Sequence, residues 1–420
     1  MANETQPNRL KLVLLRKCNM KYIRFIICLI FTSFIFLKGN SQSWIRQESN
    51  INTDLLDIHF INQEIGFAVG NNGVILKTSD GGNQWVLKSS GTTNDLVSIC
   101  FPDSLTGFAI SSSEVLKSTD GGETWQVKDT VLNTNLTHIH FVGQDTGFIV
   151  GRGRMLITMD KGASWIKREI PGLSFNNFWA TDSKTLYDNE TDFLILKSTD
   201  GGENWFVSHD YGVVGNWRDM FFTSKEVGYV LGRGTAQGFS WGMIVKTTNG
   251  GNDWTLSGYK ELDSYLNSIF FISDSVGYVV GNKVLKTEDA GESWIDLNCN
   301  ENSELTSVYF TDLLTGYIVG SNGTILKTDK GGISFTSSPV AATSIKLYPN
   351  PVNDILHIEL INPSIQNSEI SIYTITGDLS AKHIVRGDQA FLKVADLHRG
   401  FYIVSITNKE QTVCLRFYKQ

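Results

Sequence analysis

Cysteine and proline are both scarce in this chain, with five and seven residues among 420. Two of the cysteines, Cys18 and Cys28, fall in the N-terminal leader. The other three, Cys100, Cys299 and Cys414, lie far apart, and no CxxC pair occurs. The sequence therefore predicts no zinc site, no redox motif and no disulfide framework, but three isolated, mostly buried thiols.

Positive charge is in deficit and long apolar runs are missing. Lysine and arginine number 36 against 43 aspartates and glutamates, a net charge of −7, so bulk charge does not favour binding to nucleic acid. The run Phe25–Leu37 has 13 residues, which is too short to span a bilayer comfortably. No other stretch suits a bilayer, so we expect no transmembrane segment in the mature chain.

The short apolar run has the features of a signal peptide. Lys21 and Arg24 precede it, and the small residues Gly39 and Ser41 occupy the −3 and −1 positions of a cleavage site. A signal peptide over residues 1–41 is favoured over a retained anchor. Export through the periplasm is the expected consequence.

Glycine, in contrast, is abundant at 39 residues and recurs in a repeated motif, Thr/Ser-x-Asp-Gly-Gly-x-x-Trp. Seven copies occur, and the last, Thr328–Phe335, has lost its Asp and its Trp. The Asp positions are 40, 40, 40, 49, 40 and 41 residues apart, about the length of a four-stranded propeller blade. In chain order these positions hold Asp80, Asp120, Asp160, Asp200, Asn249, Asp289 and Lys330.

Each repeat unit predicts strands. Leu96–Phe101 alternates along its length, a Gly-aromatic step such as Gly66-Phe67 follows in six of the seven units, and a run such as Val74–Lys77 leads into the motif. Period-two alternation with glycine-rich breaks is typical of β-strands, and no window shows a helical apolar stripe. The prediction is an all-β chain: a seven-bladed β-propeller followed by a small C-terminal β-sandwich.

The motif itself is interpreted as structural. Its Asp accepts backbone N–H bonds across a tight turn, its glycines supply positive φ, and its Trp buries a large area against the sheet. The aspartates are therefore expected to make turns and not to act as catalytic acids.

The ends of the repeat array predict how the ring closes. Trp44 lies 16 residues before Phe60, the interval that separates Trp85 from Phe101 and recurs in most units. Trp44–Glu48 is then an outer strand without its own preceding blade, while the last motif lacks its Trp. We expect the N-terminal strand to complete the last blade and to hide an open sheet edge.

These repeats resemble a known family. Leu55–Phe60, Gly66–Gly70 and Ile75–Trp85 are similar to the photosystem II stability/assembly factor family of seven-bladed Asp-box propellers, over about Ser43 to Phe335. A looser similarity extends to bacterial neuraminidase repeats and to reducing-end xyloglucan hydrolases. The resemblance implies the fold and says little about function. A role in photosystem assembly does not follow, because the secretion signals indicate a non-photosynthetic setting.

The C-terminal segment carries a second resemblance. Leu347–Pro351, Ile370–Gly377, Gly400–Val404 and the basic, aromatic Arg416–Lys419 occur in order. They resemble the type A sorting domain of type IX secretion, found in Bacteroidetes. The resemblance implies a partner, the type IX secretion machinery, and a secreted or outer cell-surface location.

One blade predicts a ligand-binding face. The interval from Asp200 to Asn249 carries nine extra residues, most of them in the hairpin Arg233–Gly242. The loop His209–Arg218 enters the same blade and is expected beside that hairpin. Exposed aromatics on a rigid scaffold indicate recognition. The candidate ligand-binding residues are Tyr211, Trp217, Arg218, Arg233, Phe239 and Trp241.

Arginine placement adds to this prediction. Five of the six propeller arginines fall in blades 3 to 5, and Arg152 and Arg154 lie in a hairpin expected on the same face. Such a patch suits carboxylates or sulfates of a glycan, or an acidic protein tail. The alternative is a chance cluster on an ordinary solvated surface.

Three functions remain open. The favoured one is a non-catalytic binding module for a glycan or protein; the others are a chaperone-like assembly factor and a glycoside hydrolase. The carboxylates expected on the loop face form no recognisable catalytic pair, so we predict no enzyme and no catalytic residue. They are Asp95, Asp188, Glu190, Asp210, Asp219 and Asp263.

The expected organisation is a leader (1–41), the propeller (42–338), a linker (339–344) and the sorting domain (345–420). A monomer without cofactor or metal is predicted. His138 and His140 lie on one strand face without an evident third ligand, which favours structural imidazoles.

Overall fold

The structure is a computed structural model. It describes residues 44–130, 135–189, 194–210, 215–236, 239–262, 265–297, 299, 301–332, 345–361, 368–374, 379–385, 387–407 and 412–420. The predicted leader 1–41 and linker 339–344 lie outside these residues.

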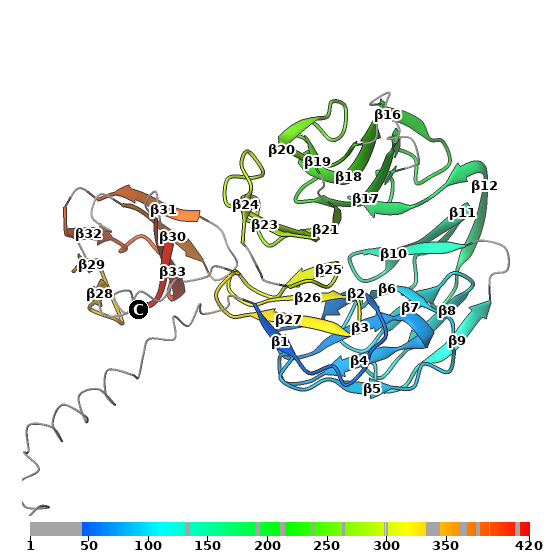
Figure 1. The fold of residues 1–420 in the computed structure, drawn as a ribbon, viewed down its shortest axis with the longest axis horizontal. Helices are drawn as coiled ribbons and strands as arrows, with labels where there is room; N and C mark the ends of the chain where they lie inside the picture. The colour runs from blue at the N-terminus through cyan, green and yellow to red at the C-terminus, as the bar shows by residue number, and fades with distance from the viewer. Residues whose placement is uncertain are drawn as a thin grey trace, which may run out of the picture. The chain divides into compact units, whose positions relative to one another are not determined.

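Seven antiparallel sheets account for the described strands between Ile45 and Thr328 (Figure 1). The first three consist of β2 (Leu55–Phe60), β3 (Gly66–Gly70), β4 (Ile75–Thr78) and β5 (Val86–Lys88); β6 (Leu96–Cys100), β7 (Gly107–Ser111), β8 (Glu114–Ser118) and β9 (Gln126–Thr130); and β10 (Leu136–Val142), β11 (Thr146–Thr158) and β12 (Ile166–Ser174).

The next three sheets consist of β13 (Asn177–Ala180), β14 (Leu186–Asn189), β15 (Leu194–Ser198) and β16 (Phe206–Asp210); β17 (Gly215–Phe222), β18 (Gly228–Ala236), β19 (Phe239–Thr247) and β20 (Thr255–Leu262); and β21 (Leu266–Phe271), β22 (Gly277–Gly281), β23 (Val284–Thr287) and β24 (Ile295–Asp296). The last consists of β25 (Leu305–Phe310), β26 (Gly316–Gly320), β27 (Thr324–Thr328) and β1 (Ile45–Gln47). A short 3-10 turn, η1 (Asn71–Gly73), joins β3 to β4.

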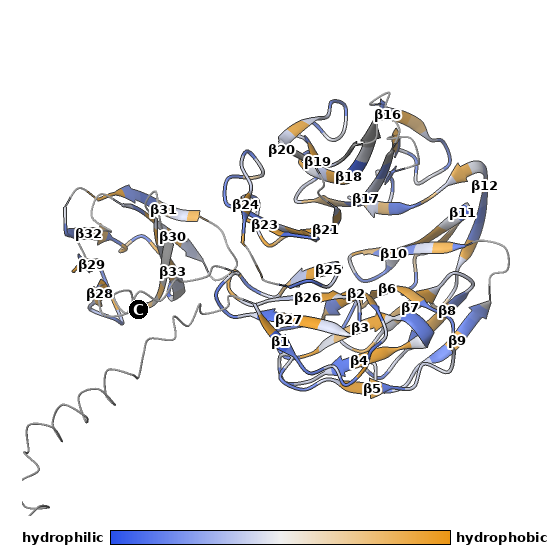
Figure 2. Ribbon diagram, in the orientation of Figure 1, coloured by the Kyte–Doolittle hydropathy of each residue, from blue (hydrophilic) through white to orange (hydrophobic). Residues whose placement is uncertain are grey.

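The first strands of the sheets form a closed circuit. They contact one another in the order β2, β6, β10, β13, β17, β21 and β25, and β25 contacts β2. Hydrophobic residues concentrate along the strands (Figure 2), and each apolar core draws on two neighbouring sheets. One of these cores joins Phe60 of the first sheet to Tyr317 and Ile325 of the last. The fold is a β-propeller.

The N-terminal strand closes the last sheet, which confirms the sequence-based prediction. β1 pairs antiparallel with β27, with Ile45 opposite Lys327 and Gln47 opposite Ile325 (Figure 1). Trp44 is fully buried and meets Phe310 edge to face, with ring centroids 5.9 Å apart. The outer edge of β27 is therefore covered by a strand from the other end of the repeat array.

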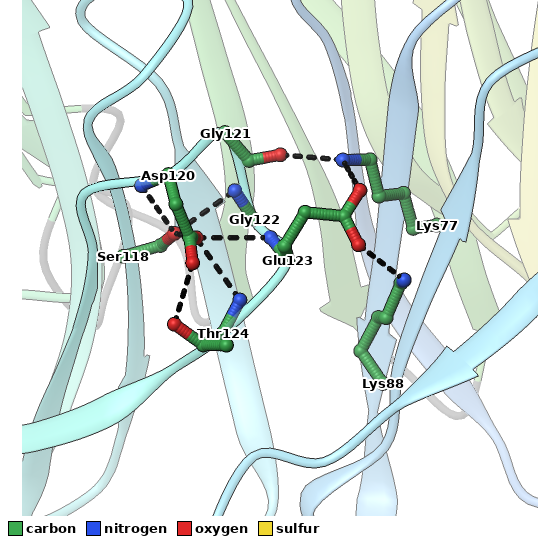
Figure 3. Close-up of polar contacts among 8 residues, drawn as sticks. All are labelled: Lys77, Lys88, Ser118, Asp120, Gly121, Gly122, Glu123 and Thr124. Atoms are coloured by element: carbon green, nitrogen blue, oxygen red, sulfur yellow. Dashed lines mark hydrogen bonds and ion pairs between the residues drawn. The ribbon is translucent and has the colours of Figure 1, made fainter.

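The repeated motif forms a turn tied by side-chain oxygens (Figure 3). Ser118 Oγ donates to Asp120 Oδ1 and accepts from the N–H of Gly122. Asp120 Oδ1 also accepts the N–H groups of Glu123 and Thr124, and its Oδ2 accepts the Thr124 hydroxyl. These hydrogen bonds to the ionised form, chiefly those from Thr124, lower the pKa of Asp120 to about 2. The carboxylate is thus committed to the turn.

A lysine from one sheet also binds the turn of the next. Lys77 Nζ, on β4, donates to the carbonyl oxygen of Gly121 at 2.6 Å and pairs with Glu123 (Figure 3). β11 has Ile157 at the lysine's place, and there Arg168 from β12 donates to the carbonyl oxygen of Gly201 at 2.6 Å. Equivalent lysine contacts join Lys117 to Gly162 and Lys197 to Gly250.

A bulge recurs in the first strand of six sheets. In β2 the register shifts between Leu55 and Asp57, and in β17 between Trp217 and Asp219. The extra residue of the bulge changes the sheet face toward which the following side chains point. Counted from the residue just before the bulge (Leu55 in β2, Trp217 in β17), residues three and five line the middle of the propeller, whereas residues one, four and six pack into the cores. The remaining shifts lie in β6, β10, β21 and β25.

The C-terminal part is a small sandwich. One sheet holds β28 (Ile345–Tyr348), β29 (Ile355–Leu360) and β32 (Gln389–Lys393). The other holds β31 (Leu379–Ile384), β30 (Glu369–Thr374), β33 (Gly400–Thr407) and β34 (Thr412–Lys419). Inward residues of both sheets, such as Leu356, Ile358, Ile372 and Val404, share one apolar core. Alternating burial along β29 explains why a single sheet face is apolar.

Candidate functional site

One aromatic residue of the predicted face is buried, which corrects the expectation that it is exposed. Trp217 is only 3% exposed and packs with Tyr187, Met220 and Trp254. Trp241 is partly buried against the same core. A Cβ at Gly234 would lie 2.6 Å from the Trp241 ring, so the glycine-rich strand makes room for the indole.

The remaining aromatic candidates give less information. Tyr211 lies outside the described residues. Phe239 begins strand β19, but the structure describes only its backbone. The inserted residues lengthen the hairpin, because β18 and β19 stay paired from Gly228–Thr247 out to Ala236–Phe239. The sequence placed the insertion in this hairpin, and the paired strands β18 and β19 extend into it.

Two of the predicted arginines do come together. Arg218 and Arg233 line a groove of about 530 Å³ that extends over β21 to the segment before β25. Arg218 is exposed, and no hydrogen bond or ion pair involves it among the described residues. The groove is further lined by Tyr265, Asn267, Asn282, Ser303 and Glu304.

Arg233 is held in place by Tyr265. Its guanidinium carbon lies 3.7 Å from the centroid of the Tyr265 ring, and Nη2 donates to the Tyr265 hydroxyl at 2.9 Å. A guanidinium stacked on a ring keeps its plane fixed, which suits directed hydrogen bonding to an anion. Sequence analysis missed Tyr265, which lies in the loop entering the next sheet.

The acidic residues at this groove already have partners. Glu301 pairs with Arg46 at 3.2 Å and accepts the N–H groups of Asn302 and Ser303. Glu304 Oε1 accepts from the side chain of Asn267. The groove therefore offers the exposed guanidinium of Arg218 to an incoming anion, beside the guanidinium of Arg233 that Tyr265 holds in place.

The other arginines lie elsewhere. Arg154 pairs with Glu169 across β11 and β12, and Arg152 is exposed opposite Ser174. Neither lines the groove of Arg218 and Arg233, so the patch is smaller than predicted.

Two carboxylates expected to be solvated loop charges lie on strands instead, Asp188 buried and Asp219 partly exposed. Asp188 has no exposed surface and accepts the N–H of Asn176. Asp219 lies in the wall of a central cavity. Asp95 and Asp210 are exposed as expected, while Glu190 and Asp263 lie outside the described residues.

The central cavity has a volume of about 410 Å³ and is lined by the first strands of the sheets. In Figure 1 the labelled first strands β2, β6, β10, β17, β21 and β25 surround the middle of the propeller. Because side chains alternate along a strand, residues three and five form two successive rings. With the count started at Phe175 for the sheet of β13, the third position is polar in all seven sheets, and all but Asn177 are among the residues that line the cavity: Asp57, Ser98, His138, Asn177, Asp219, Ser268 and Ser307.

The fifth position forms an aromatic collar. Six of its seven residues carry rings: His59, His140, Trp179, Phe221, Phe270 and Tyr309, with Cys100 as the seventh. Neighbouring rings touch in sequence, with centroids 4.4, 4.7, 5.3, 4.9 and 5.3 Å apart from His140 round to His59. All seven side chains are partly exposed, and all line the cavity.

The two aspartates of the polar ring join neighbouring sheets. Asp57 Oδ2 accepts the N–H of Ile99 at 2.9 Å, and Asp219 Oδ2 accepts that of Ile269 at 2.9 Å. Burial raises the pKa of Asp57 to about 6 despite hydrogen bonds from Ile99 and Ser307 that lower it. Burial raises the pKa of Asp219 to about 7, and the nearby charge of Asp57 adds to the effect.

The histidines of the cavity are neutral at physiological pH. Burial lowers the pKa of His59 and of His138 to about 4, and that of His140 to about 3. His140 Nε2 lies 3.1 Å from the carbonyl oxygen of Ala180 on the next sheet. The described residues contain no group of three or more side chains suited to holding a metal ion.

The protein is a β-propeller with a polar groove that extends over β21, a central cavity lined by the first strands of the sheets, and a C-terminal sandwich. A family model described as the secretion system C-terminal sorting domain matches residues 346–420. That domain directs export by type IX secretion to the cell surface or outside. A second family model, described as photosynthesis system II assembly factor YCF48, matches residues 37–126 and again 91–174.

Two curated proteins are similar to parts of the repeat region. The photosystem II stability/assembly factor HCF136 of Guillardia theta is 36% identical over 70 residues, 16% of this chain and 18% of that protein. The photosystem II assembly lipoprotein Ycf48 of a Synechococcus strain is 40% identical over 45 residues, 11% of this chain and 14% of that protein. The matches thus span less than a fifth of either relative.

Solved structures show the fold over a longer stretch. YCF48 bound to D1 peptide covers 68% of this chain and 96% of its own, with a TM-score of 0.56 and 20% identity. YCF48 from Cyanidioschyzon merolae covers 68% and 98%, with a TM-score of 0.55 and 18% identity. The GH74 xyloglucanase from Xanthomonas campestris covers 89% and 67%, with a TM-score of 0.54 and 11% identity. At these identities the likeness concerns fold alone.

Within the described residues, no helix has both the length and the apolar character needed to cross a membrane.

Proposed function

We propose that this protein is an exported, non-catalytic binding module, and that the groove of Arg218 and Arg233 holds an anionic group of its ligand. The observation that carries this proposal is the pair of guanidiniums lining one groove, one exposed and one stacked on Tyr265. Two guanidiniums favour a planar, doubly charged or bidentate acceptor such as a carboxylate or sulfate.

A protein ligand is favoured over a glycan. Apolar or aromatic platforms usually support sugar rings, and Tyr265, the only aromatic ring among the described residues that line the groove, is already covered by Arg233. The side chains of Asn267 and Asn282 also line the groove, where Asn267 donates to Glu304 and to the carbonyl oxygen of Leu305, and Asn282 accepts the N–H of Tyr265. Among the solved neighbours, YCF48 is described as bound to D1 peptide, which supports an assembly-factor-like role for this fold.

A hydrolase is the second candidate, because GH74 enzymes share the fold. The described carboxylates give this candidate little support. Asp57 and Asp219 bond to strand backbone, and Asp120 is held within its turn. Release of reducing sugar from polysaccharides by the purified chain would favour the hydrolase.

The proposal is tested by binding of the purified chain to a peptide library and a glycan array, beside two variants. Arg218→Ala removes the exposed guanidinium of the groove. Arg152→Ala removes an exposed arginine that does not line it. We expect binding of acidic peptides, weakened at least about tenfold by Arg218→Ala, since a charged hydrogen bond contributes roughly 1.5–3 kcal/mol. An equal loss of affinity in both variants would show that net charge alone causes the effect, and would contradict the proposal that the groove binds the ligand.

A further inference from the structure

We propose that the central cavity binds a small organic cation of the quaternary ammonium class. This inference is independent of the Arg218 groove, because none of the residues that line that groove lines the cavity. It concerns the aromatic collar and the polar ring described above.

The first step is the character of the collar. Six rings in mutual contact surround one space, and each keeps part of its surface exposed there. Partly exposed aromatic surface inside a folded domain leaves apolar area in contact with water. The negative faces of such rings attract cations, and cages of aromatic side chains recognise quaternary ammonium ligands.

The second step is the charge of the cavity wall. Asp57 and Asp219 belong to the ring next to the collar, two residues along their strands from His59 and Phe221. Among the described residues that line the cavity there is no lysine or arginine. The histidines are neutral, and the pKa values of Asp57 and Asp219 are about 6 and 7, so above neutral pH the ionised aspartates meet no cationic side chain in the wall. The uncompensated charge is negative, which complements a cation and disfavours an anion.

The third step is size and hydration. A cavity of about 410 Å³ lies within the range of small-molecule pockets. The collar supplies few hydrogen-bond acceptors, because Tyr309 donates its hydroxyl to the carbonyl oxygen of Phe60 and His140 is engaged with Ala180. A methylated ammonium needs no hydrogen bonds and sheds water easily, whereas a primary ammonium or a metal ion needs several acceptors.

The experiment is calorimetric titration of the purified chain with choline and with 3,3-dimethylbutan-1-ol, its neutral isostere. We expect choline to bind at least about tenfold more tightly than the isostere, since the charge is what the rings and aspartates recognise. Nα-acetyl-lysine amide, a primary ammonium, should bind more weakly than choline.

Variants assign the binding to the cavity. Trp179→Leu and Phe270→Leu each remove one ring of the collar and should weaken choline binding roughly 3- to 30-fold. Phe206→Leu is the matched control, because Phe206 is 48% exposed and lies outside the cavity. Thermal unfolding checks that each variant is folded, and either collar variant alone suffices for the test.

The proposal is overturned if millimolar choline produces no binding heat, or if the isostere binds equally well. Tighter binding of the lysine amide, or choline affinity unchanged in both folded collar variants, would overturn it too. None of these outcomes bears on peptide binding at the Arg218 groove, so the two proposals fail separately.

Discussion

The ammonium of Lys77 lies 2.6 Å from the carbonyl oxygen of Gly121, which belongs to the turn of the neighbouring sheet. The lysine is 8% exposed, and its second partner is Glu123 at 2.6 Å. The two residues are 44 positions apart in the sequence, so their contact joins successive blades. The turn leaves the carbonyl oxygen of Gly121 accessible, and the buried ammonium of Lys77 needs such a hydrogen-bond acceptor.

Replacing Lys77 with Met should therefore destabilise the propeller. The buried carbonyl of Gly121 would lose its charged donor, at a cost of roughly 1–3 kcal/mol in the free energy of unfolding. Lys88→Met is the control, since Lys88 contacts Glu123 but not the carbonyl, and exposed ion pairs contribute about 0–1 kcal/mol. Chemical denaturation measures both. Equal effects would mean that the ion pair, and not the carbonyl contact, holds the turn.

Trp44→Ala should weaken the closure of the ring. The indole is fully buried and packs on Phe310, so its loss leaves a cavity worth about 3–5 kcal/mol. Ile45→Ala, in the same strand but 54% exposed, should cost far less. Thermal unfolding with both variants separates the two positions. A Trp44→Ala protein as stable as the native chain would show that β1 does not hold the last sheet.

The turn glycines allow a steric effect to be separated from backbone strain. Gly122 and Gly91 both have φ of +77°, but a Cβ at Gly122 would lie 2.3 Å from the Phe67 ring, whereas one at Gly91 meets nothing within 4 Å. We expect Gly91→Ala to cost on the order of 1 kcal/mol from the positive φ alone. Gly122→Ala should cost about 1–3 kcal/mol more from overlap with Phe67. Similar losses in urea unfolding would indicate that the ring moves aside freely.

Asp219 should make stability depend on pH near neutrality. Its pKa is raised to about 7 in the folded state, so between pH 4 and 7 this carboxyl group binds more protons in the folded chain than in the unfolded chain. Its contribution to stability is therefore present at low pH and is lost as pH rises towards 7. Asp219→Asn cannot titrate, so its stability relative to the native protein should increase from about pH 5 to 7.5.

The variant difference is the quantity to measure, because the buried histidines act in the opposite direction. Their lowered pKa values make the unfolded chain bind more protons between about pH 4 and 6.5. Both proteins share that contribution, so it cancels. A difference in unfolding free energy that stays constant over this pH range would show that Asp219 titrates normally.

Much of the fold was predictable from the sequence. The spacing of the Asp positions predicted the sheets, and the unpaired Trp44 predicted that β1 joins β27. Those predictions work because a turn or a strand pairing depends on residues close in the chain or on a repeated local pattern. The C-terminal strands were predicted for the same reason.

The candidate site was predicted only in part. Arg218 and Arg233 do share a groove, but Trp217 is buried in the core between two sheets, at the position before the bulge that Leu55 holds in β2. Tyr265 was missed because it belongs to the next repeat, and only the packing of neighbouring sheets places it under Arg233. No local pattern carries that information.

By itself the sequence determined the strands, the box turns and the order in which they follow one another, since these depend on alternation, glycine and short-range hydrogen bonds. Tertiary structure alone decided the collar and the polar ring. Each of their members comes from a different repeat, some 40 residues from the next, and is unremarkable within its own strand. Closure of the propeller brings seven such residues around one axis. There, burial raises the pKa of Asp219, and the aromatic side chains contact one another and form one surface.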